Sequence, residues 1–198
     1  MQGRLRGCRR VKGLLNLKEC NQEEFISSWS NLYLDAFEEN YVSRINKKQF
    51  SEEDIKELFV WKAQHKLFRT HTKFVDNVIA KLSIVNELKN SFDEARFEEE
   101  FGSEAAIWQI FLKHIIQPQQ FPIFDQHTYR AFMFVEKGEI LELPKNNKKK
   151  LNIYQEEYQP FFNQFNCSNK KKIDEALVAF GEFLKAYGEL VVGKIARL

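Results

Sequence analysis

The ten residues FPIFDQHTYR, numbered 121–130, mark the point at which one helix has to stop and another can begin. The preceding segment 107–116, IWQIFLKHII, is apolar on nearly every side, which is typical of a helix buried in a core. Pro118 and Pro122 then prevent this helix from continuing, because proline lacks the N–H donor and restricts the residue before it. The sequence therefore predicts a turn between two helices here.

Asp125 stands directly before the second helix of this pair. At that position a carboxylate accepts hydrogen bonds from backbone N–H groups that the helix itself leaves unpaired. Two roles fit this placement. Asp125 is a helix cap alone, which is the more frequent role for such a residue, or it is a catalytic acid that the cap holds at a fixed point.

The apolar helix, the short turn and the run Phe124-Asp125-Gln126-His127-Thr128-Tyr129-Arg130 resemble the segment of the helix-hairpin-helix DNA glycosylases that delivers their catalytic aspartate. Upstream, EFGSEAA at 100–106 falls where that family has its hairpin. It keeps the second glycine as Gly102, the closing alanine and the helix that follows, but Glu100 replaces the first glycine. The resemblance covers residues 99–132 and is one of pattern rather than identity.

The resemblance implies an all-α fold, a single compact multi-helix domain like the glycosylase core, and hydrolysis of the N-glycosidic bond of a base flipped out of double-stranded DNA. It makes Asp125 the catalytic carboxylate and places Gly102 and Ser103 against the DNA. His127 and Arg130 are expected to reach a phosphate or to orient the acid. Their alternative roles are a surface histidine and an arginine paired with a neighbouring acid.

Glu104 occupies the position at which the bifunctional members of that family carry a Schiff-base lysine. A carboxylate cannot form an imine with an opened sugar, so the expected activity is monofunctional, without β-lyase chemistry. The sequence has no cysteine-rich tail of the kind that holds an iron–sulfur cluster, and we expect no cofactor and no metal. Glu104 and the missing glycine also favour an alternative, a non-catalytic helical DNA-binding or protein-interaction domain that keeps the glycosylase scaffold.

Composition supports a helical protein with one well-filled core. The chain has 198 residues, and its 19 Phe against 8 Gly and 4 Pro leave few turn residues for a sandwich or barrel. We expect a basic, flexible or loosely docked arm at 1–20 and one helical domain at 21–198, with about seven or eight helices and the first and last of them packed together. No apolar run reaches membrane-spanning length, so we expect a cytoplasmic protein without a membrane partner.

Basic residues gather in three places although the formal net charge is only +2. They are Arg4 to Lys12, Lys145 to Lys150, and Lys170 to Lys172. Lys148, Lys149 and Lys150 are expected to contact DNA phosphates, and the alternative for each run is a solvated surface. Acidic residues crowd 93–104, the segment whose backbone amides would meet a phosphate, which opposes DNA binding there.

Periodic apolar residues predict the remaining helices. A broad stripe covers 25–37, a capped start at Ser51 opens a short helix, and the longest regular stripe of the first half covers 74–88. A Ser91-x-x-Glu94 capping box is expected to open an acidic helix ending near Gly102. Later in the chain we expect a polar loop at 145–150, an aromatic stripe at 154–165 interrupted by Pro160, and a last long helix in which Gly181 and Gly188 permit close packing.

Overall fold

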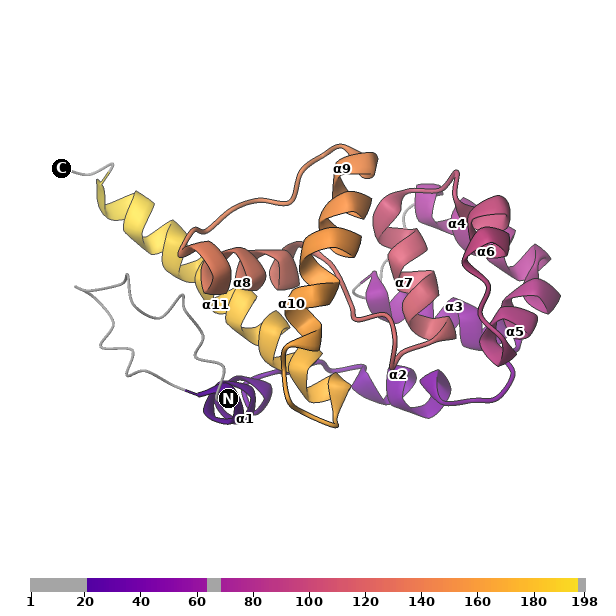
Figure 1. Cartoon of the computed structure of the whole chain (residues 1–198), viewed down its shortest axis with the longest axis horizontal. Coiled ribbons are helices and arrows are strands. Elements are labelled where there is room, and N and C mark those ends of the chain that lie inside the picture. The colour runs from indigo at the N-terminus through magenta and orange to yellow at the C-terminus, as the bar shows by residue number, and fades with distance from the viewer. Residues whose placement is uncertain (1–20, 64–68, 196–198) are drawn as a thin grey trace. The chain divides into compact units, whose positions relative to one another are not determined.

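The computed structural model describes residues 21–63 and 69–195, and within this part of the chain every regular element is a helix (Figure 1). This confirms the predicted all-α class. The basic arm predicted for residues 1–20 lies outside the described residues. Within the described ranges, no helix is long and apolar enough to cross a membrane.

The contacts divide the described residues into two compact units, one formed by residues 21–34 and 122–195 and the other by residues 35–63 and 69–121. The single domain expected for residues 21–198 stays a prediction, and the two units are described one at a time. The first unit holds α1 (Gln22–Ser30), α8 (Gln126–Lys137), α9 (Asn147–Asn152), the π-helical turn η2 (Ile153–Tyr158), α10 (Gln159–Asn163) and α11 (Lys170–Ile195). The second unit holds α2 (Glu38–Ile45), α3 (Glu52–Lys62), α4 (Arg69–Ala80), α5 (Leu82–Asn90), α6 (Glu94–Phe101) and α7 (Ala106–Ile116).

In the first unit, α1 and α8 pack on α11. α1 lies against it through aromatic rings, with Phe25 and Phe180 edge to face at 5.4 Å and Trp29 at 4.8 Å from Phe180. This packing confirms that the first and last helices of the described chain lie together. α8 also lies along α11, and Gly181 makes their close approach possible, since a Cβ there would lie 2.0 Å from the carbonyl oxygen of His127.

In the second unit, α7 is the buried element, as its apolar sequence predicted. Phe111 of α7 and Phe74 of α4 both contact Phe59 of α3, with ring centroids 5.2 and 5.4 Å from it. Aromatic pairs of this kind add to the free energy gained by burying the rings. The rings therefore tie three helices of the unit to one another.

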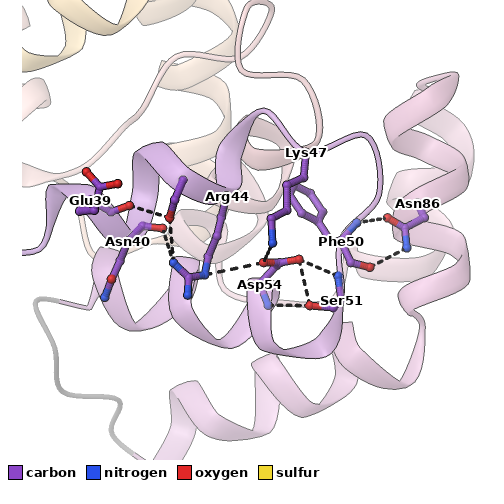
Figure 2. A network of polar contacts seen from close by, with 9 residues as sticks. Glu39, Asn40, Arg44, Lys47, Phe50, Ser51, Asp54 and Asn86 are labelled. Atoms are coloured by element: carbon purple, nitrogen blue, oxygen red, sulfur yellow. Dashed lines mark hydrogen bonds and ion pairs between the residues drawn. The ribbon is translucent and has the colours of Figure 1, made fainter.

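A buried carboxylate closes the turn between α2 and α3 (Figure 2). Asp54 accepts hydrogen bonds from Lys47 Nζ at 2.6 Å and from the backbone N–H and hydroxyl of Ser51 at 2.9 Å each. These partners hold the pKa of Asp54 below its usual value in spite of the opposing effect of its burial. The start of α3 at Ser51 is thus confirmed, and Asn86 of α5 fixes the preceding Phe50 by bonding both its N–H and its carbonyl oxygen.

Two predicted helices are shorter than their stripes. The helix expected through residue 37 ends at Ser30, because Asp35 bonds the N–H of Phe37 and holds a turn, and this leaves Leu34 92% exposed. The stripe at 74–88 is broken between α4 and α5 at Lys81, whose Nζ is occupied by the carbonyl oxygen of Glu100 at 2.8 Å. The described residues consequently form eleven α-helices and one π-helical turn, more than the seven or eight expected.

Three local predictions were wrong in detail. The polar loop expected at 145–150 contains the start of α9, because the Asn146 side chain accepts the N–H of Lys149 and caps a helix. The cap of α6 is Asp93 rather than Ser91, since the Asp93 carboxylate accepts the N–H of Arg96. Pro160 does not interrupt its helix, because the chain widens into the π-helical turn η2 just before it, and α9, η2 and α10 run on continuously (Figure 1).

Candidate functional site

Asp125 caps α8 through one carboxylate oxygen. Its Oδ1 accepts the backbone N–H of His127 at 2.8 Å and that of Thr128 at 3.1 Å. In return the Thr128 hydroxyl oxygen accepts the N–H of Asp125 at 2.9 Å, which completes a capping box. Asp125 is half-buried, so its carboxylate lies where the core meets solvent. The cap role predicted for Asp125 is confirmed, and the catalytic role remains a prediction.

The extended segment before Asp125 is held by side chains from two other elements of the same unit. The Tyr154 hydroxyl donates to the carbonyl oxygen of Pro122, and the Tyr158 hydroxyl donates to that of Ile123, each at 3.1 Å. The Ile123 N–H donates to the Asp174 carboxylate of α11 at 3.2 Å. Because all these groups are buried, the backbone leading into Asp125 is fixed by bonds that water does not replace.

Burial raises the pKa of Tyr158 well above its ordinary value, and the nearby carboxylates of Asp174 and Asp125 raise it further. The phenol therefore keeps its proton and acts as a donor throughout the pH range in which proteins fold. Burial also raises the pKa of Tyr129, with a smaller effect from Glu157.

His127 lies one position into α8 from the capping residue. Its backbone carbonyl faces Gly181 of α11, and its side chain is half-buried. The ring Nδ1 is shielded from solvent and has no hydrogen-bond partner among the described residues. An unsatisfied ring nitrogen costs free energy unless water or a ligand meets it. His127 is therefore not the plain surface histidine that was its alternative role.

Arg130 is almost fully buried, with 2% of its side chain exposed. One terminal nitrogen donates to the carbonyl oxygen of Gly181 at 3.0 Å, and the other pairs with Glu142 at 3.0 Å. Breaking such a pair would leave a buried charge uncompensated. The structure therefore gives Arg130 its alternative role, that of an arginine paired with a neighbouring acid, and this role also ties α8 to α11.

Lys148 and Lys149 are exposed on α9, and Lys150 beside them is half-buried. These lysines belong to the same unit as Asp125, and no ion pair of theirs occurs among the described residues. The other lysine run is partly engaged, because Lys171 pairs with Glu175 and Lys170 lies over the ring of Phe162. The α9 lysines are thus available for an anionic partner.

Gly102 and Ser103 form the turn between α6 and α7. A Cβ at Gly102 would lie 2.4 Å from the carbonyl oxygen of Glu98, so the turn requires glycine. The Gln109 side-chain amide closes the turn by donating to the carbonyl oxygens of Gly102 and Glu104. Ser103 is exposed, and Glu104 accepts a hydrogen bond from Asn77.

The acids around this hairpin are largely paired. Lys113 on α7 is buried and bonds to both Glu94 and Glu98, at 2.5 and 2.9 Å, while Lys81 pairs with Glu100 at 3.0 Å. The repulsion expected between this acidic segment and a phosphate is therefore weaker than the sequence indicates. Lys81 and Lys113 come from other helices, which is why the sequence pattern did not show this pairing.

The structure brings Asp125, His127, Arg130 and the α9 lysines together in one unit, whereas Gly102 and Ser103 belong to the other. Sequence reasoning missed Tyr154, Tyr158 and Asp174 as parts of the site, since it assigned the two tyrosines to a core stripe. No group of three or more His, Cys, Asp and Glu side chains that could hold a metal ion is found in the described part of the chain.

No family model, curated protein or solved structure matches this sequence.

Proposed function

We propose that this protein is a monofunctional DNA base-excision glycosylase, or a close relative, in which Asp125 is the catalytic carboxylate. The observation that carries the proposal is a half-buried carboxylate with one capped oxygen, at the end of a segment held by Tyr154, Tyr158 and Asp174. A catalytic acid has to be held in this way, because a carboxylate that reorients in the transition state loses much of its electrostatic effect.

The proposed chemistry uses the negative charge of Asp125. As the N-glycosidic bond breaks, the base leaves with the bonding electrons and positive charge develops on the sugar. The Asp125 carboxylate stabilises that charge and orients a water molecule, whose oxygen adds to the sugar carbon while the departing base takes up a proton. Glu104 provides no amine for an imine, so an abasic sugar is the final product.

DNA contacts are proposed for each unit taken by itself. In the Gly102–Ser103 turn the Gly102 N–H already donates to the carbonyl oxygen of Glu98 at 2.9 Å, so the Ser103 N–H would be the donor to a phosphate. The acids beside this turn are paired with lysines of their own unit. Lys148, Lys149 and Lys150 would contact further phosphates. His127, whose Nδ1 lacks a partner among the described side chains, is the residue of α8 best suited to meet the substrate.

The experiment is a base-release assay on a panel of duplexes that carry deaminated, alkylated or oxidised bases. The wild type should release one class of base, and Asp125→Asn should release it at least about a hundredfold more slowly, because asparagine caps a helix well but carries no charge. Asp93→Asn makes the same chemical change at the cap of α6 and serves as the matched control. Base release by Asp125→Asn at the wild-type rate would eliminate the catalytic role.

A second candidate function is a non-catalytic DNA-binding or protein-interaction domain on the same scaffold. The burial of Arg130 favours it, because this residue supports the helix packing and is not presented to a substrate. Under this alternative, the wild type binds duplex DNA or a protein but releases no base from any member of the panel. Asp125→Asn then differs from wild type only in stability.

A further inference from the structure

The chain passes from one unit to the other twice, once between Leu34 and Asp35 and once between Phe121 and Pro122. At the first crossing, Leu34 is 92% exposed, and the backbone hydrogen bonds on either side of it join residues three positions apart. At the second crossing, residues 121–124 are all buried. The second crossing is therefore the one whose geometry is controlled by the surrounding side chains.

Phe121, the last residue of the second unit, is held by bonds within that unit. Its N–H donates to the carbonyl oxygen of Gln117 at 3.0 Å, and its ring lies 4.9 Å from the ring of Phe92. Its carbonyl oxygen is hydrogen-bonded to His114 Nδ1 at 2.7 Å, and Nδ1 carries the proton because a carbonyl oxygen can only accept. Since a peptide group is planar, these bonds fix the plane that joins Phe121 to Pro122.

The next peptide group, which joins Pro122 to Ile123, is held by the first unit. Its carbonyl oxygen accepts a hydrogen bond from the Tyr154 hydroxyl at 3.1 Å, and its N–H donates to the Asp174 carboxylate at 3.2 Å. Tyr154 is 2% exposed and Asp174 is 4% exposed, so water does not compete for these bonds. Both polar groups of this second plane are thus bonded to buried side chains, one from η2 and one from α11.

Two torsion angles, φ and ψ of Pro122, separate the plane held in one unit from the plane held in the other. The pyrrolidine ring of proline fixes φ at about −65°, so ψ of Pro122 is the one soft torsion between the two planes. As long as both planes are held, a change of orientation at this crossing is a rotation about the Cα–C bond of Pro122.

We propose that Pro122 is a hinge with a single rotatable torsion between the two units. The exposed crossing at Leu34 and Asp35 follows this rotation. Asp125 and the groups that cap it belong to the first unit, so the rotation leaves the cap unchanged. The hinge rests on the hydrogen bonds and the proline ring, and it does not depend on the proposed glycosylase function.

The test is pulsed dipolar electron paramagnetic resonance on the full chain, with spin labels at Glu53→Cys and Lys185→Cys and with the three native cysteines replaced by serine. Both labelled positions are exposed, and they belong to different units. Pro122→Gly frees φ and should widen the distribution of label distances about twofold or more. Pro118→Gly is the matched control, because it makes the same change inside the second unit and should leave the width unchanged. Equal widths in these two variants would overturn the proposal.

A second pair of variants covers the case in which Pro122→Gly does not fold. Tyr154→Phe removes the donor to the Pro122 carbonyl oxygen and should also widen the distribution, because one of the two bonds that hold this plane is lost. Tyr158→Phe removes a hydroxyl from the same turn, but this hydroxyl donates to the Ile123 carbonyl oxygen, which lies beyond the hinge. Tyr158→Phe should therefore leave the width unchanged, and the same width in both tyrosine variants would contradict the hinge.

Discussion

Gly181→Ala should destabilise the protein strongly although it adds only one methyl group. The new Cβ would lie 2.0 Å from the carbonyl oxygen of His127, 2.6 Å from its carbonyl carbon and 2.9 Å from its Cα. All three are backbone atoms of α8, so no side-chain rotation can relieve the overlap. The two helices would have to separate, and the bond from Arg130 to the Gly181 carbonyl oxygen would lengthen or break.

The expected destabilisation follows from three contributions. Overpacking against rigid backbone costs about 1–3 kcal/mol. Breaking a hydrogen bond from a charged, buried group adds about 1.5–3 kcal/mol. Replacing glycine by alanine within a helix returns about 1 kcal/mol. The net destabilisation is therefore about 1.5–5 kcal/mol, a large share of the stability of a small protein.

The assay is urea unfolding followed by circular dichroism, with Gly188→Ala as the matched control in the same helix. A Cβ at Gly188 would meet only the Ile140 side chain, at 3.8 and 3.9 Å, which is an ordinary van der Waals distance. That variant should be as stable as wild type or more stable by up to about 1 kcal/mol, because alanine favours the helix. Equal stability of the Gly181 and Gly188 variants would refute the close packing of α8 on α11.

Three further predictions follow from single features of the two units. Burial, opposed by a bond to a backbone carbonyl and assisted by two nearby lysines, lowers the pKa of His114 from 6.5 to about 4, so the folded state favours the neutral ring. The stability that the neutral His114 ring contributes is complete above pH 6.5 and is lost as the pH falls toward 4, by about 3 kcal/mol in all. Unfolding curves at pH 7.5 and 4.5 should therefore show a loss of stability in the wild type that is missing in His114→Phe. Asp125→Asn should cost only a few tenths to about 1 kcal/mol in urea unfolding, because asparagine is also a good cap, and a larger cost would show that the charge stabilises the fold. Replacing Lys148, Lys149 and Lys150 by alanine should reduce the slope of log K on log salt for duplex binding by about 0.9 for each phosphate that is no longer neutralised, whereas identical slopes would remove these lysines from the DNA path.

Local sequence was sufficient to locate α8 and its ends. Asp125 caps the start, and Gly138 at the end adopts the left-handed φ of 71° that glycine tolerates best. The apolar composition of α7 likewise predicted its burial. These features depend on residues within a few positions of one another, so a short window of sequence contains the physical cause.

Periodicity did not locate the breaks in the long stripes. Residues 25–37 have the period of one helix, but α1 stops at Ser30 once Asp35 holds a turn. The break at Lys81 accompanies a bond to Glu100, and the π-helical turn accommodates Pro160. Periodicity shows which residues can share a face, yet it does not show whether another element is present to cover that face.

By itself, the sequence determined that the protein is helical and that a carboxylate stands at the head of α8, because caps and periodicity act over a few residues. Only the tertiary structure decided what surrounds that carboxylate. Arg130 finds its partner at Gly181, 51 residues away, and Tyr158 finds its partner at Ile123, 35 residues away. Which distant groups meet depends on how whole helices pack, and that packing is set by the sum of many weak interactions that no short stretch of sequence contains.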